Sequence, residues 1–530
     1  DVEAGGALTV GGDSIAAGTV TLSAGNGDLN AAGAITGQFG FVTISDSNGT
    51  AHIGNVTADG TITITGTDAS VTTGNLAAID GSSVSVTTSG SGDISVGTIT
   101  GSSSGALGSV NLSAAGALTT NGSAISAGSV TLAAGNGDLT ATGDITSTDP
   151  TQLLSISDGS GKITLGNVSA AGNLNISDGN AEIAGNGISA GNLNVKLGGG
   201  SISVTSFGDS ADITVGQVSG GTADTPLSSI TLAAGGGLKT ATGATPDSLS
   251  ADSLSLSSAN GDLVTGDLIV TGANQGISVS AVGGNLNVGA VQTNAGISLS
   301  DTGGNLSAGA LTVASGSGVT VTSDGNIGTG IIATSTPGGD LSLVDAEAGG
   351  TLPLGNSSIT ADTIILSAGA GFMNLGPLTG GAGGISLTNT GGAIAISSAT
   401  TTDAGDITAN ASSAGVSYGT IDAAGSVDLS GTSISADNGT STLDSGHNVT
   451  LTASAGGIST NGIGSNESIT LSATGGDITT GNLTGGIDGT VSVTTLTSGN
   501  ISVGAIGPAA GSLDSVQLAS AGSLTTNGND

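Results

Sequence analysis

The sequence contains no cysteine, tryptophan or arginine, and only three of its 530 residues are lysine. Aromatic residues amount to 1% of the chain, although hydrophobic residues together amount to 36%. Without large aromatic side chains the chain lacks the material of an ordinary globular core. Its apolar content nevertheless exceeds what a disordered chain carries. Ile, Val, Leu and Ala in short alternating runs, interrupted by frequent glycine, are instead a β composition with many turns.

The scarcity of basic residues excludes whole classes of partner. Asp and Glu number 39 against three Lys, and the formal net charge is -36. Such a surface repels the phosphates of nucleic acids and the headgroups of anionic membranes. No stretch of 18 apolar residues occurs, so the sequence predicts no membrane-spanning helix. We therefore expect no nucleic-acid partner and no membrane insertion.

The start of the chain and the lack of cysteine bear on its location. No charged-then-apolar leader follows Asp1, so we expect either that a leader has been removed or that these residues belong to a longer protein. The absence of disulfides fits an exported bacterial protein.

What the sequence has in abundance is one short motif, in which two apolar residues flank a small polar residue. It recurs 24 times between Val20 and Val516, at a mean spacing of about 22 residues. The motifs begin at Val20, Val42, Ile62, Val84, Val110, Val130, Leu154, Leu174, Leu193, Ile213, Ile230, Leu254, Ile277, Ile297, Val319, Leu341, Ile364, Ile385, Ile407, Val427, Val449, Ile469, Val491 and Val516.

Two further apolar positions follow within each step, separated by Gly, Asn, Asp and Ser. A period near 22 with three short strands is typical of one coil of a parallel β-helix, in which each strand pairs with its equivalent one coil further on. We predict an all-β fold, a parallel β-helix (β-solenoid) of roughly 24 coils, and treat residues 1–530 as one continuous repeat array. The clearest examples are Leu139 and Ile145 after Val130, Ile163 and Val168 after Leu154, and Ile183 and Ile188 after Leu174.

Alternation within a strand predicts which side chains enter the core. Val130 and Leu132 should point inward, whereas Ser129 and Thr131 should point outward. A slim core has no room for large rings, so the aromatic residues are expected at corners or on outer faces. These are Phe39, Phe41, Phe207, Phe372 and Tyr418.

Two other repeat folds fit this sequence less well. Leucine-rich repeats need a helix-side consensus that is missing here. Calcium-binding nonapeptide repeats need GGxGxD at a period of nine, whereas Gly-Asp pairs recur here at about 22 residues.

Longer sequence segments are repeated in distant parts of the chain. GSVNLSAAGALTTNG at Gly108 recurs as DSVQLASAGSLTTNG at Asp514, and GSLTTNG near the end is a version of GALTVGG at Gly6. Neither end shows a capping helix or a polar terminal repeat, which a finite solenoid needs. We expect a unit or piece of a longer fibrous array, or separate copies that stack end to end into a filament.

Repeats such as AGSVTLAAGNGDLTATGDIT and GNLNISDGNAEIAGNGISAGNLNV resemble the repeat regions of filamentous haemagglutinin-like adhesins. The resemblance covers essentially the whole chain, but the family's amino-terminal secretion domain is not found. It implies a bacterial exoprotein of the two-partner secretion type, folded as a long right-handed β-helix. A secreted or cell-surface location is then expected, with surface glycans or receptors on host or neighbouring cells as partners.

Candidate catalytic residues are few. Polysaccharide lyases of this fold need a base, often Lys or Arg, together with cations that stabilise a carboxylate, and the three lysines here are scattered. Hydrolases of this fold use clustered Asp with sugar-stacking aromatics, but Tyr418 is the only Tyr. A Ser-His-Asp site would need His52 or His447, which occupy solvent-side strand or turn positions. We expect no enzyme activity, and a polysaccharide-degrading enzyme is a remote alternative.

Turn carboxylates are the candidate metal ligands. Corners such as GNGD at Gly135 and SDGSGK at Ser157 offer Asp and backbone carbonyl oxygens, which suit Ca²⁺. Stacking would bring carboxylates of successive coils close together, and their repulsion would favour cations. No cofactor is required, but calcium is a candidate, with ligands at one kind of corner: Asp28, Asp138, Asp262, Asp340 and Asp477. The alternative is that Asp and Asn simply suit turn geometry.

One face carries a regular series of hydroxyl groups. Outward positions beside the marked strands are largely Ser and Thr, which suggests an ice-binding ladder as one alternative. Interruptions in this ladder favour plain solvation or hydroxyl stacking, and they are Asn192, Asn194, Asp212, Asp428 and Gln517.

These observations predict a structural or adhesive protein of the bacterial exterior. An acidic β-helical rod would serve as a filament, stalk or matrix component, kept soluble by its charge. An interaction module that binds a glycan, a cation or ice is the alternative.

Overall fold

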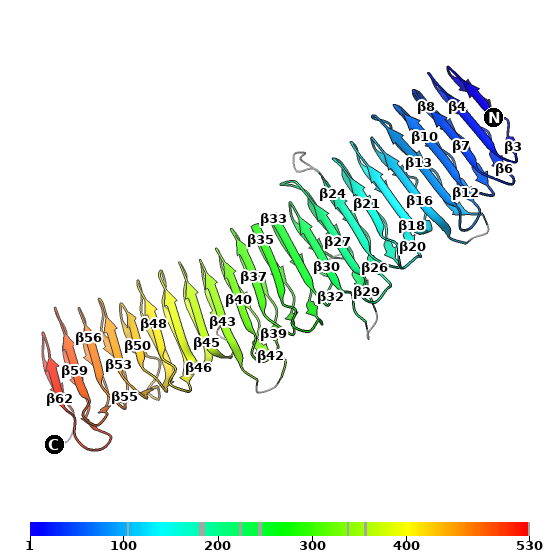
Figure 1. Cartoon of the computed structure of the whole chain (residues 1–530). Coiled ribbons are helices and arrows are strands. Elements are labelled where there is room, and N and C mark those ends of the chain that lie inside the picture. The colour runs from blue at the N-terminus through cyan, green and yellow to red at the C-terminus, as the bar shows by residue number, and fades with distance from the viewer. Residues whose placement is uncertain are drawn as a thin grey trace. The chain divides into compact units, whose positions relative to one another are not determined.

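The computed structural model describes residues 1–102, 105–179, 186–221, 225–241, 246–336, 339–354 and 358–527. All regular structure in these residues is β-strand, and no helix occurs among them. The strands form a parallel β-solenoid of about 23 turns with roughly 22 residues in each (Figure 1). The predicted fold class is therefore confirmed. A membrane-spanning helix is not found in the described part of the chain.

The chain divides into two compact units. Unit 1 comprises Asp1–Gly272 and Val279–Gly284, and unit 2 comprises Ala273–Ser278 and Asn285–Asp530. In each unit, strands of successive coils pair in parallel, and equivalent residues stand in register. Each residue thus lies between its counterparts in the coils before and after it.

The longest strands of the coils form one side of the solenoid, which we call the first face. In unit 1 its ladder pairs Val20 with Val42 and Val42 with Ile62, and unit 2 continues the same pattern from Ile297. In unit 1 these strands are β1 (Val2–Ala4), β4 (Val20–Ala24), β7 (Val42–Asp46), β10 (Ile62–Thr67), β13 (Ser83–Ser89), β16 (Leu107–Ala114), β18 (Ile125–Ala134), β21 (Leu154–Asp158), β24 (Leu174–Asp178), β27 (Ser201–Ser206), β30 (Ser229–Ala234) and β33 (Leu254–Thr265). In unit 2 they are β37 (Ile297–Thr302), β40 (Gly318–Ser323), β43 (Leu341–Ala348), β45 (Ile359–Ala368), β46 (Met373–Asn389), β48 (Ile407–Ala411), β50 (Val427–Gly431), β53 (Val449–Ala453), β56 (Ile469–Ala473), β59 (Thr490–Thr495) and β62 (Ser515–Ala519).

Two shorter strands complete each coil and form the second and third faces. After Val130 these are β19 (Leu139–Ala141) and β20 (Ile145–Ser147). Leu139 pairs with Ile163 of β22 (Lys162–Leu165), and Ile145 pairs with Val168 of β23 (Val168–Ala170). The two apolar positions predicted after Val130 and after Leu154 are therefore confirmed.

The core is built as strand alternation predicts. Val130 and Leu132 are fully buried, Thr131 is exposed and Ser129 is half-buried. Successive side chains of a strand point to opposite sides, so every second residue enters the interior. Because equivalent residues stack, the interior consists of continuous columns of Ile, Leu and Val, and this explains why the same short pattern recurs along the chain.

Two of the predicted coil starts are wrong. Leu193 lies in β26 (Leu193–Val195) and pairs with Val168 on the third face, whereas Ile213 pairs with Ile188 on the second face. The first-face residue between Leu174 and Ile230 is Ile202, which pairs with both. Two long coils therefore replace three short ones, and about 23 turns result. Extra residues at corners lengthen a coil without changing strand register, so a fixed period assigns later strands to the wrong face.

A third coil start is also wrong, for a related reason. Leu341 pairs with Ala361, and the first-face residue of that coil is Val344, which lies between Val319 and Ile364. β43 begins before the corner, so its first apolar residue is not its first-face residue. In the lengthened coil after Leu174, Ile188 belongs to the second face, and Ile183 lies outside the described residues.

The aromatic residues follow the prediction with one exception. The four phenylalanines are more than half exposed, and Phe39 is 89% exposed. Tyr418, expected at a corner or outer face, is instead 1% exposed in β49 (Val416–Ala423). Its register partners are Ile396 and the small Ala436, and the small partner leaves room for the ring. Burial raises the pKa of the Tyr418 hydroxyl.

Leu132→Ala is expected to lower the free energy of unfolding by about 2 to 5 kcal/mol, because it leaves a cavity in a continuous apolar column. Thr131→Ala, one residue away but exposed, is the matched control and should change it by less than about 0.5 kcal/mol. Denaturant-induced unfolding followed by circular dichroism measures both. Equal effects of the two substitutions would contradict the assigned strand orientation.

Candidate functional site

Three of the predicted metal ligands belong to a hydrogen-bonded ladder at the corner between the first and second faces. We call outer corner column the residues that directly precede the second-face strands. In it, Oδ1 of Asp28 accepts the backbone N–H of Thr50 at 2.9 Å. Asp138 Oδ1 accepts that of Lys162 at 2.9 Å, and Asp477 Oδ1 accepts that of Asn500 at 2.7 Å. Each carboxylate thus binds the equivalent residue one coil further on.

Asparagine performs the same task in other coils of this column. Asn285 Oδ1 accepts the backbone N–H of Asn305 at 3.0 Å, Asn305 Oδ1 that of Asn326 at 2.9 Å, and Asn326 Oδ1 that of Thr351 at 2.8 Å. An acceptor oxygen is all that the position needs, so Asp and Asn are interchangeable there. The frequent Asp and Asn of the corners therefore have a structural reason.

The structure does not bring the five predicted calcium ligands together. Asp262 lies in β33, directly before Leu263, and so occupies the outer corner column. Asp340 directly precedes Leu341 and lies at a different corner, so the expectation of one common corner is wrong. The register partners of these Asp include Thr50 and Lys162, not further carboxylates. The described residues contain no group of three or more His, Cys, Asp or Glu placed to hold a metal, and calcium binding by the five stays a prediction.

A second set of carboxylates is buried, and of these only Asp158, within SDGSGK, was named from the sequence, as part of an exposed type of corner. We call inner corner column the last inward-pointing residues of the first-face strands. Asp46, Asp158 and Asp178 occupy it and are 2%, 3% and 0% exposed. Each is the third inward residue of its strand, as in Val42, Ile44 and Asp46. The repeated letters ISD, with alternation carried one step further, are the signal that could have located them.

Other residues of the inner corner column show what this position requires. Asn389 Oδ1 accepts the backbone N–H groups of Gly391 and Gly392, while its Nδ2 donates to the carbonyls of Gly371 at 2.9 Å and Ala393 at 3.1 Å. In further coils a hydroxyl group donates to main-chain carbonyls of the corner, as for Ser258, Ser323 and Thr495. In these coils main-chain carbonyl oxygens therefore face this position, and a side chain with a hydrogen-bond donor satisfies them.

The buried aspartates satisfy only part of this requirement. Asp158 Oδ1 accepts the backbone N–H groups of Ser160 and Gly161, both at 3.0 Å, as Asn389 Oδ1 does in its own turn. Asp158 Oδ2 and both carboxylate oxygens of Asp178 and of Asp46 are buried without a hydrogen-bond partner. An ionised carboxylate cannot donate, so these oxygens lack the partner that a hydroxyl or amide finds.

Burial shifts the acidity of these groups. It raises the pKa of Asp46 and of Asp158 above the ordinary value. Burial, and next the charge of Asp158, raise the pKa of Asp178 to about 6. Nearby backbone N–H groups oppose the shift in all three cases, but desolvation is the larger effect.

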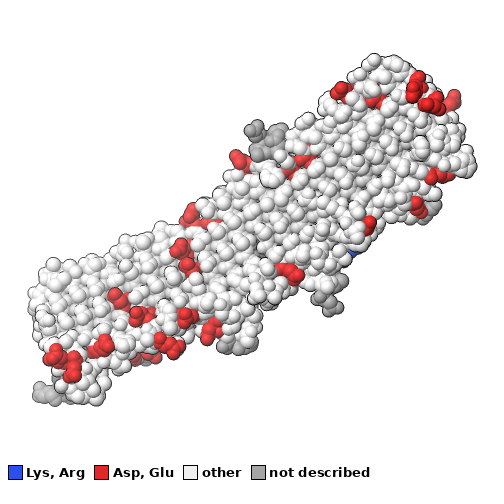
Figure 2. Space-filling model, viewed as in Figure 1, with Lys and Arg blue, Asp and Glu red and all other residues white. Residues whose placement is uncertain are grey.

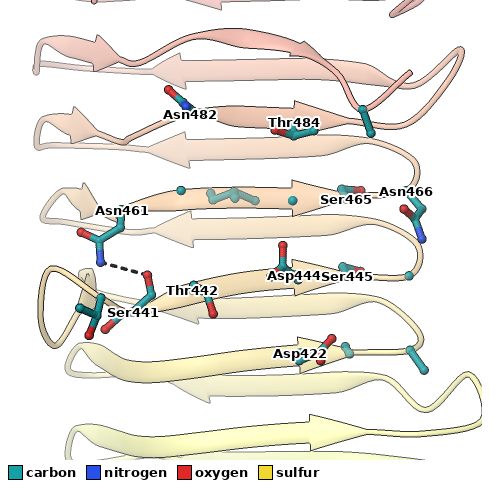
Figure 3. A pocket seen from close by; sticks show the side chains of 18 of the residues that line it. Asp422, Ser441, Thr442, Asp444, Ser445, Asn461, Ser465, Asn466, Asn482 and Thr484 are labelled. Carbon is teal, nitrogen blue, oxygen red and sulfur yellow. Dashed lines mark hydrogen bonds between the residues drawn. The ribbon is translucent and has the colours of Figure 1, made fainter. Parts of the chain in front are cut away.

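Unit 2 contains a groove of about 790 Å³ (Figure 3). It crosses β49, β52 (Thr442–Ser445), β55 (Gly462–Ser465) and β58 (Leu483–Gly485). The outward positions of β55 are Gly462 and Gly464, which have no side chains, while Thr442 and Asp444 project from the coil before. The groove is therefore the space of two missing side chains in an otherwise filled face.

The groove is polar and acidic. Asp422 and Asp444 are register partners in adjacent coils, and both are exposed. Although Asp444 is exposed, the neighbouring groove walls remove part of its hydration, and this loss, and next the charge of Asp422, raise its pKa. A Cβ atom on Gly464 would come within 2.3 Å of Asp444 Oδ1, so the carboxylate lies close over that glycine. Hydroxyl and amide groups line the rest, and no basic or aromatic side chain is among the lining residues.

The two histidines lie on the solvent side, as predicted. His52 is exposed in β8 (Gly49–Ile53). His447 lies in a turn, and its Nδ1 is 2.9 Å from Oε1 of Glu467, with both side chains about half exposed. A pair of this kind on the surface contributes little to stability.

The first face of unit 1 carries no charge along its central outward column. The faces visible in Figure 2 show acidic side chains gathered toward the borders, with wide neutral areas between them. Because Leu193 and Ile213 are not first-face residues, the predicted interruptions Asn192, Asn194 and Asp212 fall on other faces. The central column consists of Thr21, Thr43, Thr63, Ser85, Asn111, Thr131, Ser155, Asn175, Ser203, Thr231 and Ser255.

Comparison with known proteins gives no match: no family model, no curated protein and no solved structure matches the chain. The fold and the arrangement of side chains are thus the observations on which a function can be argued.

Asp178→Asn is expected to remove part of the pH dependence of unfolding. The pKa of Asp178 rises from 3.8 to about 6 on folding, so its stabilising contribution is full below pH 3.8 and is lost as the pH rises through 6. That difference corresponds to about 3 kcal/mol. The measurement is denaturant unfolding of the parent chain and the variant from pH 4 to 7, in buffer with a chelator. The free energy of unfolding of the parent should fall over this range by more than that of the variant.

Asp477→Asn, at an exposed outer corner, is the control for that measurement and should follow the parent chain across the whole range. A variant at Asp178 whose unfolding free energy ran parallel to the parent at every pH would contradict the assigned pKa.

Proposed function

We propose that this chain is a structural or adhesive fibre protein of the bacterial cell exterior. The observation that supports the proposal is that successive coils are joined by the same kinds of hydrogen bond along both units. Backbone ladders and corner side chains such as Asp138 and Asn326 bind each coil to the next throughout both units. Hydrogen bonds that run from coil to coil suit a protein that bears load along the solenoid or holds a binding surface at a distance.

The surface charge fits the same role. A formal net charge of -36 keeps neighbouring solenoids apart and soluble, and nucleic acid is an unsuitable partner for it. The family resemblance in the repeats points to secretion to the cell surface, with glycans or receptors of other cells as targets. The charge is spread over the whole surface and the resemblance over the whole chain, so neither points to a single site.

End-to-end association is the assembly that this fold favours. In the last described coil, Val516 and Leu524 occupy inward columns but are 49% and 48% exposed, and Val2 in the first coil is 44% exposed. Apolar columns and unpaired strand edges of this kind are covered when another coil stacks on them. In the proposed filament a second copy of the chain supplies that coil.

A second candidate function is glycan binding in the groove of unit 2. The groove offers hydroxyl, amide and carboxylate groups in a row, and Gly462 allows a ligand to approach the backbone. Asp422 and Asp444 in adjacent coils would bind sugar hydroxyls directly or through a shared cation. A polysaccharide-degrading activity, the remote alternative, would use the same two carboxylates. Ice binding would instead use the uncharged first face of unit 1.

The fibre proposal predicts that purified chains, concentrated at neutral pH, form unbranched filaments one solenoid wide. Electron microscopy of negatively stained samples measures this. Val516→Asp should shorten the filaments, because it places a charge on the exposed apolar column, and Thr494→Asp on the outer side of the neighbouring coil is the control. Single particles at every concentration, with no attachment to cells or surfaces, would contradict the proposal.

The glycan proposal predicts that Gly462→Gln abolishes binding on a glycan array. The nearest atom to a Cβ at Gly462 is the carbonyl oxygen of Asn482 at 3.5 Å, so the new side chain fills the groove without straining the backbone. Gly328→Gln, at an open strand position elsewhere in unit 2, is the matched control and should leave binding unchanged. Equal binding by both variants would exclude the groove.

A further inference from the structure

Two of the buried aspartates are stacked directly on one another. Asp158 of β21 and Asp178 of β24 are register partners in successive coils of unit 1. Both point into the inner corner, where Asp178 is 0% and Asp158 3% exposed. Two carboxylates are thus held together out of contact with water, and nothing basic shares the inner corner column with them: the next residue in it is Ser206, whose hydroxyl donates to the carbonyl of Ala211 at 2.6 Å.

The pair occupies a position at which other coils place a hydrogen-bond donor. In equivalent positions Asn389 and Ser258 direct a donor at main-chain carbonyl oxygens of the corner. Asp158 Oδ2 and both oxygens of Asp178 have no hydrogen-bond partner. Nearby backbone N–H groups offset only part of the cost of burying these two carboxylates, so the pair is stable in the interior only with a proton or a cation bound.

The spacing of the coils suits a cation. Strands of one ladder lie about 4.8 Å apart, and Ca²⁺ binds oxygen ligands at about 2.3 to 2.6 Å. A calcium ion midway between two stacked carboxylates therefore meets an oxygen of each at its usual distance. Two negative charges match its double charge, and carboxylate with main-chain carbonyl oxygen is the ligand chemistry that it prefers.

We propose that Asp158 and Asp178 bind one calcium-type divalent cation between their two coils. The ion joins the coils from inside, where the outer corner columns join them by hydrogen bonds. Protons compete for the same oxygens. Asp46, whose register partners are Ala24 and Gly66, is a single buried carboxylate and takes a proton only. This inference does not depend on the fibre proposal, because it concerns the interior of unit 1.

The test uses the full chain after treatment with EDTA and exchange into chelator-free buffer. Ca²⁺ is titrated at pH 7.5 by isothermal calorimetry and by thermal unfolding, with Mg²⁺ as the comparison ion. We expect binding of about one Ca²⁺ per chain and a rise in the unfolding temperature, both lost at pH 4.5 where protons displace the ion. The double variant Asp158→Asn with Asp178→Asn should fold, because Asn389 satisfies the same position by itself, and should lose at least tenfold in calcium affinity.

The control is the double variant Asp28→Asn with Asp477→Asn, which removes two exposed carboxylates of the outer corner column and keeps the buried pair. It should bind Ca²⁺ like the parent chain. Loss of binding in this control but not in the buried variant would place calcium at the outer corners and overturn the proposal. A parent chain that gains stability from acid but shows no calcium effect at pH 7.5 would also overturn it, and would mean that the two carboxyl groups share a proton.

Discussion

Pairing in register between equivalent residues of successive coils is the constraint on which the whole structure depends. Once Val110 pairs with Val130 and Thr131 with Ser155, every position becomes a column of similar side chains along the solenoid. A column of Ile, Leu and Val can be buried at any length because each layer packs on an identical one. The side chains of a polar column must find their hydrogen-bond partners in the coil before or the coil after. The composition of the chain follows from this rule, since large rings and bulky charged groups rarely suit a position that repeats about every 4.8 Å.

The same residue type has opposite consequences on the two sides of one corner. Asp138 in the outer corner column faces water and accepts a backbone N–H from the next coil. Asp178 in the inner corner column is removed from water, and neither of its carboxylate oxygens has a hydrogen-bond partner. Burial therefore converts a structural acceptor into a group that needs a proton or a cation. In one coil Asp158 occupies the inner position and Lys162 the outer one, so a displacement of four residues across the corner determines which of the two an aspartate becomes.

Local departures from the repeat are where a solenoid can acquire a specific surface. The groove of unit 2 exists because Gly462 and Gly464 follow Thr442 and Asp444 in the same columns, so that one layer lacks side chains between layers that have them. The uncharged column from Thr21 to Ser255 on the first face of unit 1 arises in the opposite way, by unbroken repetition of Ser, Thr and Asn. A uniform scaffold with a few such departures is compatible with a fibre that also carries binding surfaces.

The sequence by itself determined the period, the inward alternation of Val130 and Leu132, the solvent-side histidines and the acidic surface. These are local properties, because alternation and turn residues act within a few positions and the same pattern recurs from coil to coil. Tertiary pairing alone decided that Ile202, and not Leu193 or Ile213, continues the first face, because extra residues at a corner change the spacing without changing the register. It also decided the burial of Tyr418 against Ala436, the placement of Asp158 directly on Asp178, and the hollow over Gly462. Each of these depends on which residue of another coil lies opposite, and that partner is some 18 to 28 residues away along the chain.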